Sequence, residues 1–245
     1  MASVPSQEFR DGIRGDPRPW LRRASSKTWP SSRRRRAWPR TRRPAAGAAQ
    51  LLSRDTRVSR IARIEAGIPR CRRCPELRDY CARVAREKRR AFTGWSYWGR
   101  PVPGFGDPAA RIWILGLAPA AHGANRTGRM FTGDRSGEFL YAALHRAGLA
   151  NRAASISRDD GMRLSGVYIG AALRCAPPAN RPTPGQLAAC SSWLEQECEA
   201  LARWRVLLCL GAIAWDAAVD LLARRGSSLP RPKPRFAHGA HIELG

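Results

Sequence analysis

No long hydrophobic run occurs in the 245 residues of this chain. The longest, over residues 206–215, spans ten positions and contains a glycine, whereas a membrane-spanning helix needs roughly 18 to 20 apolar residues. The first thirty residues carry charges throughout, so the apolar segment of a secretory signal is missing as well. These absences predict a cytoplasmic protein with no membrane partner, in which the seven cysteines do not form a disulfide framework.

Acidic residues are also scarce. The chain holds 19 Asp and Glu against 44 Lys and Arg, a formal net charge of +25. Such an excess raises the local concentration of polyanions and makes binding to them strongly dependent on salt. Nucleic acid is therefore the leading class of partner.

Part of the positive charge belongs to an N-terminal segment of unusual composition. Residues 1–50 contain 12 Arg and one Lys against three acids, interleaved with Pro, Ser and Trp and without a helical or strand period. They hold too little apolar surface to offset chain entropy, which predicts a disordered basic tail. The tail is either a nonspecific DNA-binding arm or the product of a start codon placed too far upstream. The rest of the chain, residues 51–245, is basic in its own right and forms one predicted domain.

Strand and helix patterns alternate from residue 51 onward. Helices are predicted over residues 51–66, 75–90, 136–147, 183–202 and 212–225, and short buried strands over 111–117, 167–173 and 204–210. Val58, Ile61 and Ile64 have helical spacing, and Pro75 suits a first helical turn. Alternating strands and helices predict a three-layer α/β/α domain with a short parallel sheet, whose functional loops follow the carboxyl ends of the strands.

Four cysteines have the spacing of a metal site. Cys71 and Cys74 form a C-x2-C pair in a polar turn, Cys175 directly follows the second predicted strand, and Cys190 lies on the next helix. Four thiolates suit either zinc or an iron-sulfur cluster, and the gap of about 100 residues between the pairs is longer than in a compact zinc ribbon. Another possibility is that all seven cysteines are small buried hydrophobes, which is the interpretation for Cys81, Cys198 and Cys209.

A glycine-rich loop over residues 116–137 follows the first predicted strand. Loops of about twenty residues are uncommon in compact domains unless they have a function. The loop imitates a phosphate-binding P-loop, but Arg129 and Met130 occupy the positions where that motif needs Lys and Ser or Thr. Nucleotide hydrolysis is therefore not predicted.

Three segments together resemble the family 5, or type B, uracil-DNA glycosylases of bacteria and archaea. They are the loop beginning Gly-Leu-Ala-Pro-Ala at residue 116, the Cys-Ala-Pro-Pro-Ala-Asn-Arg-Pro-Thr-Pro segment at residue 175, and the Cys71/Cys74 pair. Family 4 enzymes share the cysteine pattern but carry an acidic residue and a second Gly in the first motif. The resemblance covers about residues 55–245 and implies a [4Fe-4S] cluster on Cys71, Cys74, Cys175 and Cys190. It implies a monomeric hydrolase that removes uracil and other deaminated or damaged bases from double- and single-stranded DNA.

A glycosylase must extrude the target nucleotide and stabilise charge as the glycosidic bond breaks. Phe131 is the candidate platform for the extruded base, unless its ring simply packs in the core. Asp134 is the candidate catalytic carboxylate, and its alternative role is that of a helix N-cap. Backbone N–H groups of Leu117 and Ala118 are candidates to bind base carbonyl oxygens.

The same loop holds further polar candidates. His122 and Asn125 are secondary candidates for contacts with the base or DNA, and either side chain could instead be structural. Three arginines of the loop are expected to hold phosphates, namely Arg126, Arg129 and Arg135.

Two departures from the family pattern shape the expected activity. Ala171 stands four positions before Cys175, where related enzymes often have an Asn that reads the base, so broader base acceptance is predicted. The chain ends at Gly245 before the family's His-Pro-Ser type loop, and His238 and His241 belong to an earlier stretch. We therefore interpret the sequence as truncated, and expect an exposed sheet edge, low activity and poor solubility. The alternative function is a zinc or iron-sulfur module that binds DNA or senses redox state without catalysis.

Overall fold

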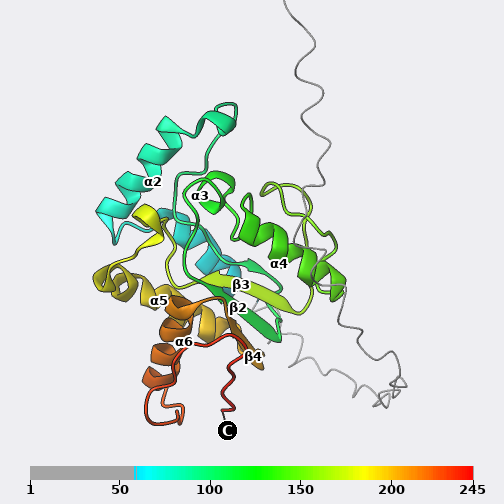
Figure 1. Cartoon of the computed structure of the whole chain (residues 1–245), viewed down its shortest axis with the longest axis vertical. Helices are drawn as coiled ribbons and strands as arrows, with labels where there is room; N and C mark the ends of the chain where they lie inside the picture. Colours follow the sequence, from blue (N-terminus) through cyan, green and yellow to red (C-terminus); the bar gives the residue numbers. More distant parts are fainter. Residues whose placement is uncertain (1–57, 59, 245) are drawn as a thin grey trace, which may run out of the picture. The chain divides into compact units, whose positions relative to one another are not determined.

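The computed structural model describes residue 58 and residues 60–244, so the predicted tail over residues 1–50 lies outside the described residues (Figure 1). One mixed sheet has the strand order β1-β3-β2-β4. Its strands are β1 (Phe105–Gly106), β2 (Ile112–Gly116), β3 (Val167–Ala171) and β4 (Val206–Cys209). β2 pairs in parallel with both β3 and β4, which confirms the three predicted strands. β1 is antiparallel to β3 and was not predicted, because two residues carry no periodic pattern.

The helices follow the predicted order with small shifts at their ends. Residues 60–67 are helical and continue into a short 3-10 turn, η2 (Ile68–Arg70). The remaining helical elements are α2 (Pro75–Glu87), η3 (Arg90–Phe92), α3 (Ala124–Thr127), α4 (Arg135–Arg146), η4 (Pro178–Asn180), α5 (Pro184–Ala200) and α6 (Ala212–Arg224). α2 ends earlier than predicted because Lys88 adopts a positive φ of 55°. Thr183 caps α5 in a capping box with Gln186.

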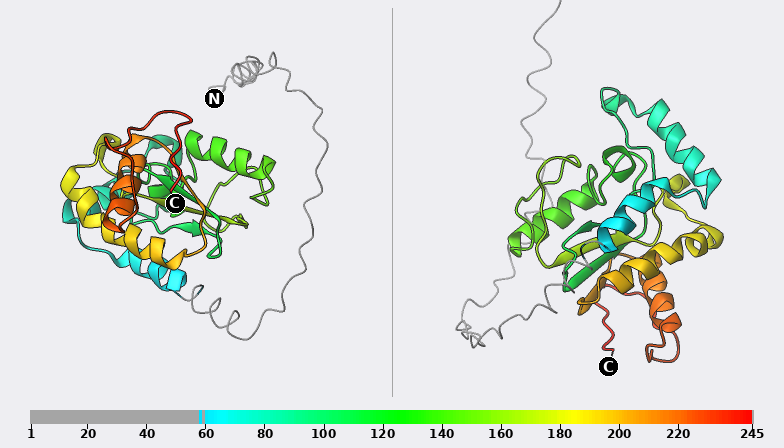
Figure 2. Two further views of the ribbon diagram at one scale, coloured as in Figure 1. Left: turned by 90° about the horizontal axis from the view of Figure 1, so that it is seen from below. Right: turned by 180° about the vertical axis from the view of Figure 1, so that it is seen from behind.

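Helices cover both faces of the sheet, which confirms the predicted three-layer α/β/α class (Figures 1 and 2). On one face, the 60–67 helix, α5 and α6 pack against the sheet through Ile61, Ile64, Leu194, Ala218, Leu221, Trp113, Leu115 and Tyr168. On the other face, α4 contributes Leu140, Tyr141 and Leu144 to a cluster with Ile114, Val167 and Ile169. Val58 does not share the buried helix face that was predicted for it, since it is 50% exposed.

β4 forms an edge of the sheet. Among the described residues it pairs with β2 alone, and its outward side chains Val206 and Leu208 are 51% and 44% exposed. Within the described residues β4 is therefore an edge strand, while the truncation, the low activity and the poor solubility expected from the sequence stay predictions. Within residues 58 and 60–244, no helix combines the length and apolarity needed to cross a membrane.

Candidate active site and cysteine cavity

A cavity of about 540 Å³ lies where the loops after β2 and β3 meet α2 and the start of α4. Its position agrees with the rule that parallel sheets bind ligands beyond the carboxyl ends of their strands. Three residues singled out in the sequence line it, namely His122, Asp134 and Arg135. The sequence did not point to the other prominent side chains, which are Tyr80, Arg89, Phe92 and Asn180.

Asp134 is both the N-cap of α4 and a wall of this pocket. Its Oδ1 accepts a hydrogen bond from the backbone N–H of Gly137 at 2.9 Å, so the N-cap interpretation is confirmed. Its Oδ2 faces Gly123, where a Cβ atom would collide with it. Capping therefore engages one carboxylate oxygen and leaves the second at the pocket wall.

His122 lies at the same pocket in a neutral form. Its Nδ1 is 3.1 Å from the Tyr97 hydroxyl, and the two rings meet edge to face. Burial lowers the pKa of His122, and the positive charges of Arg89 and Arg126 lower it further. The imidazole is thus uncharged at neutral pH. One of its ring nitrogens donates a hydrogen bond and the other accepts one.

Asn125 lies outside the pocket. It is 1% exposed, and its amide donates to the backbone carbonyls of Cys81 at 3.4 Å and Ala121 at 3.3 Å. These contacts tie α3 to α2. The position supports the structural role of Asn125 rather than a contact with the base.

Phe131 lies directly against the end of β2. Its ring approaches Gly116 so closely that a Cβ atom there would be 2.5 Å from Cζ, and its backbone has a positive φ of 53°. A strained residue on a long loop often marks a functional site. Leu117 and Ala118 follow β2 between the pocket and the cysteines: the Leu117 carbonyl accepts from the Leu173 N–H at 2.9 Å, and Ala118 packs toward the cysteine cavity.

The prediction that Arg126 holds a phosphate is wrong. The residue is 4% exposed, and its guanidinium donates to the carbonyls of His122 at 2.7 Å and Gly133 at 3.0 Å. It also lies between the rings of Phe92 and Trp95, at 4.0 and 4.2 Å from their centres. Arg126 therefore braces the loop from inside.

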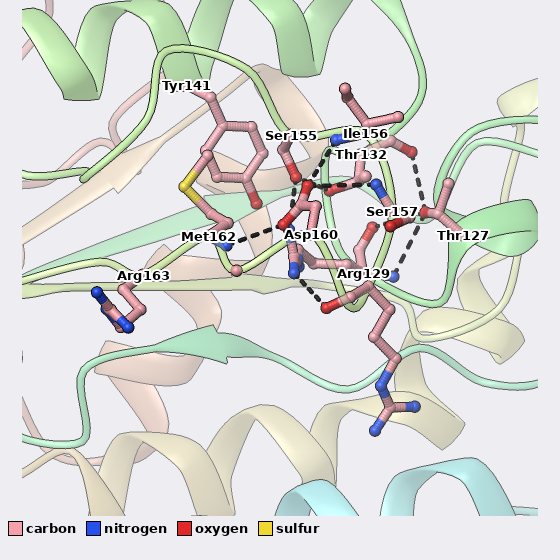
Figure 3. Close-up of polar contacts among 12 residues, drawn as sticks. Thr127, Arg129, Thr132, Tyr141, Ser155, Ile156, Ser157, Asp160, Met162 and Arg163 are labelled. Atoms are coloured by element: carbon pink, nitrogen blue, oxygen red, sulfur yellow. Dashed lines mark hydrogen bonds and ion pairs between the residues drawn. The ribbon is translucent and has the colours of Figure 1, made fainter.

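The same prediction is wrong for Arg129, which is also 4% exposed. Figure 3 shows the network around it, in which its Nη1 pairs with Asp160 and bonds Ser155, each at 2.8 Å. Thr132 joins the network through a 2.7 Å contact with Ser155. Charge alone suggested a surface role, but burial with a carboxylate partner makes Arg129 structural. Arg135 is exposed, so its expected phosphate contact stays a prediction.

Asn180 is one of the pocket residues that the sequence did not point to. It ends η4, the short turn between the cysteine loop and α5, and both it and Ala179 have positive φ angles, 56° and 51°. Two adjacent non-glycine residues in this conformation store strain of order 1–3 kcal/mol each, which is common at functional sites. The signal in the sequence was an Asn between prolines directly after the cysteine loop.

The four predicted ligand cysteines line one cavity. Cys71 and Cys74 come from the turn between η2 and α2, Cys175 follows β3, and Cys190 lies on α5. Segments about 100 residues apart in the sequence thus converge, as the spacing predicted. Cys198 is buried away from the cavity, but Cys81 is not a distant hydrophobe, because it packs in one cluster with Cys175 and its thiol donates to the Ala176 carbonyl oxygen at 3.7 Å.

Two arginines, the half-buried Arg78 and the buried Arg174, also line the cysteine cavity with unused hydrogen-bond donors. Nη1 of Arg78 and both Nε and Nη1 of Arg174 are buried without a partner. The Nη2 of Arg174 pairs with Glu197 at 2.5 Å, and both side chains are almost fully buried. Trp193 Nε1 lies 3.3 Å from the Cys71 sulfur. Buried donors without acceptors are costly, so the cavity is suited to an anionic occupant.

The Arg174–Glu197 pair extends to Tyr168 and Glu65 on the same face of the sheet. The Tyr168 hydroxyl lies 3.1 Å from Glu65 Oε1 and 3.3 Å from Glu197 Oε1. Burial raises the pKa of Glu65 to about 7 from its ordinary value of 4.5; the hydrogen bond from Tyr168 opposes this rise and the charge of Glu197 adds to it. Between about pH 4.5 and pH 7, Glu65 is therefore protonated in the folded protein and ionised in the unfolded chain.

This proton makes stability depend on pH in a predictable direction. Because the folded-state pKa of Glu65 exceeds the unfolded one, its stabilising contribution is complete below about pH 4.5 and is lost as the pH rises through about 7. We expect Glu65→Gln to leave the free energy of unfolding nearly unchanged at pH 5 and to raise it by about 1–3 kcal/mol at pH 8. Urea denaturation at both pH values measures this, with the exposed Glu87→Gln as control. A gain that is equal at both pH values would contradict the assignment.

Comparison with known proteins agrees with the fold. A family model described as the uracil DNA glycosylase superfamily matches residues 103–241. This segment contains the sheet, the glycine-rich loop and both cysteine-bearing segments after β3. The chain belongs to the uracil-DNA glycosylase superfamily, a class of hydrolases that act on N-glycosyl bonds.

Individual relatives assign the branch within this superfamily. The chain is 53% identical over 186 residues to a type-5 uracil-DNA glycosylase of Mycobacterium tuberculosis, covering 76% of this chain and 68% of the relative. It is 53% identical over 174 residues to the type-5 enzyme of Thermus thermophilus, covering 71% and 76%. A type-4 uracil-DNA glycosylase of Pyrobaculum aerophilum is 32% identical over 144 residues, 58% and 65% of the two chains. The resemblance to family 5 is therefore confirmed.

Proposed function

We propose that this chain hydrolyses the N-glycosidic bond of uracil, and of other deaminated or damaged bases, after the nucleotide is everted from DNA into the pocket beside Asp134. The observation that carries the proposal is the pocket itself. The carboxylates of Asp134 and Glu138, the neutral imidazole of His122 and the amide of Asn180 line a single cavity at the carboxyl ends of the strands, on a chain with a net charge of +25. A pocket of about 540 Å³ is of the size that holds a single nucleotide fragment.

Asp134 supplies the negative charge that the reaction needs. As the bond between C1′ and the base nitrogen breaks, its electron pair leaves with the base and the sugar becomes cationic. The carboxylate stabilises that cation and accepts a proton from the water whose oxygen bonds to C1′. The departing base anion takes up a proton, so the products are a free base and an abasic sugar.

Neutral hydrogen-bonding groups serve the base. With the Tyr97 hydroxyl donating to Nδ1 of His122, the ring proton resides on Nε2 and can be donated to a base carbonyl. Backbone N–H groups of Leu117 and Ala118 remain proposed donors and Phe131 the proposed stacking ring, although none of the three lines the pocket that holds Asp134 and His122. Ala171 is buried and has no amide, so base selection by that position is absent and a broad range of bases is accepted. The Asn180 amide is the remaining candidate to contact the base edge.

The four cysteines hold a [4Fe-4S] cluster in this proposal. The four thiols line one cavity although the two pairs lie about 100 residues apart in the sequence, which supports a shared site. The unpaired donors of Arg78 and Arg174 also match the negative charge of thiolates and bridging sulfides. When bound, the cluster cross-links the turn before α2 to β3 and α5 and stabilises both walls of the pocket.

Iron content tests the ligand set. We expect the purified protein to contain about four irons and four labile sulfides per chain, and Cys175→Ser to lose most of both. Cys198→Ser is the matched control, since Cys198 is equally buried but lies outside the cavity. Zinc in place of iron would overturn the cluster, and equal metal loss in both variants would overturn the assignment of Cys175.

The activity itself is tested on duplexes that contain one uracil, hypoxanthine or ethenocytosine. Removal of a base leaves an abasic site that alkali converts into a strand break. Strand breaks at the modified position support the proposal. Binding to these duplexes with no breaks at any of them would instead support the alternative, a DNA-binding or redox-sensing module without catalysis.

A further inference from the structure

One side of the pocket is bordered by an exposed, strongly basic segment. Residues 80–100 contain six Arg or Lys and a single Glu. Five basic side chains lie at the carboxyl end of α2 and in the turn into η3, and we call them the basic ridge: Arg83, Arg86, Lys88, Arg89 and Arg90. The four arginines are exposed. Figure 1 and the right-hand view of Figure 2 show α2 and this turn projecting from the body of the folded domain.

The charge of the ridge is not compensated within the domain. None of the ion pairs formed among the described residues involves a ridge side chain. Three exposed arginines elsewhere in the domain do form ion pairs: Arg60 and Arg225 both pair with Glu199, and Arg224 pairs with Glu195. The ridge therefore concentrates positive potential at one place, which attracts a polyanion.

The ridge and the pocket share a wall. Arg89 lines the pocket together with Tyr80 and Phe92, and Asp134 lines the same cavity. Arg83 lies over the ring of Tyr80, 5.5 Å from its centre. A strand that places one nucleotide in the pocket must therefore run past these arginines.

The turn that carries the ridge is also held in place. Arg126 lies between Phe92 and Trp95 of the turn and bonds the carbonyl of Gly133, the residue before Asp134. Lys88 Nζ closes the turn by donating to the Thr93 carbonyl at 3.1 Å. Arg126 thus fixes the distance between the ridge and the candidate carboxylate. A ligand held by the ridge is positioned relative to Asp134.

We propose that the basic ridge binds consecutive phosphodiester groups of the DNA strand whose nucleotide enters the pocket. The inference rests on the proposed function for the identity of that nucleotide. Guanidinium groups suit phosphate oxygens because their donors form two parallel hydrogen bonds. Such contacts set the register of the strand without reading its sequence. The ridge therefore positions the strand, while the pocket selects the base.

Salt dependence of DNA binding tests the ridge without relying on catalysis. The test variant is Arg89→Ala with Arg90→Ala, and the matched control is Arg203→Ala with Arg205→Ala, which removes the same charge from exposed positions before β4, at the opposite edge of the sheet. The dissociation constant of an undamaged DNA duplex is measured between 50 and 200 mM salt. Two lost phosphate contacts lower the slope of log Kd against log salt by about 1.8, so Kd rises about twelvefold less over this range than for the unchanged protein.

The control variant is expected to keep the slope of the unchanged protein. Equal slopes in the two variants would overturn the ridge, since charge alone would then account for binding. The base-removal assay separates the two ideas. A protein that removes no base but shows the slope difference retains the ridge and loses the glycosylase proposal. A protein that removes uracil and shows equal slopes retains the glycosylase and loses the ridge.

Discussion

Asp134→Asn is expected to lower the rate of uracil removal by about 10²- to 10⁴-fold while the domain stays folded. The structure makes this substitution unusually informative, because Asp134 also caps α4 through its Oδ1. Asn caps helices about as well as Asp, so the substitution preserves the cap and removes only the negative charge. Single-turnover kinetics on a uracil-containing duplex measures the rate, and urea denaturation measures the fold.

Asp107→Asn is the matched control for this experiment. Asp107 also accepts hydrogen bonds from backbone N–H groups in a turn, those of Ala109 and Gly166, each at 2.8 Å. It precedes β2, at the amino ends of the strands and so away from the pocket. We expect this variant to keep the unchanged rate. If Asp134→Asn kept its activity as well, capping would be the whole role of Asp134 and another group would have to serve the sugar cation.

Glu197→Ala is expected to lower the free energy of unfolding by about 3–5 kcal/mol. Glu197 and Arg174 are 0% and 1% exposed and bond each other at 2.5 Å, so removing the carboxylate leaves a buried guanidinium with a third unpaired nitrogen. The loss also removes an acceptor from the Tyr168 hydroxyl. Urea denaturation measures the change.

Glu199→Ala, two residues further along α5, is the control. Glu199 also forms ion pairs, with Arg60 and Arg225, but its side chain is 43% exposed. Exposed pairs contribute about 0–1 kcal/mol, so we expect a small change. Replacing both partners, Glu197→Leu with Arg174→Leu, should recover much of the loss because no charge is then left buried. Equal effects of Glu197→Ala and Glu199→Ala would show that burial of the pair does not govern stability here.

The Arg174–Glu197 pair also explains why the two candidate sites belong to one unit. Arg174 follows β3 by three residues, lines the cysteine cavity and leads into the loop that ends at Asn180 in the active-site pocket. Loss of the pair is therefore expected to affect the cysteine cavity and the pocket wall together. Glu65, two hydrogen bonds away through Tyr168, makes the same network sensitive to pH.

Local sequence patterns predicted much of the fold and part of the site. The apolar run that became β3 (Val167–Ala171), the Thr183-Pro184 start of α5 and the C-x2-C turn each depend on neighbours within a few residues, so their patterns can be recognised directly. Asp134 was predicted with both of its possible roles, and the structure confirmed the cap. The resemblance to family 5 rested on such short segments and was confirmed as well.

Only the tertiary structure showed which polar side chains pair with one another across distant parts of the chain. Arginine side chains commonly bind phosphate, but the fold buries both Arg126 and Arg129. Arg129 pairs with the carboxylate of Asp160, 31 residues further along the chain. Asn180 enters the pocket because η4 brings it there in a left-handed conformation, and Glu65 acquires its raised pKa only when Tyr168 and Glu197 surround it. Hydrophobic periodicity follows from neighbouring residues and so determined the layers of this protein. Burial and charge pairing depend on segments that meet only after folding, and so the structure alone decided which polar residues are available for function.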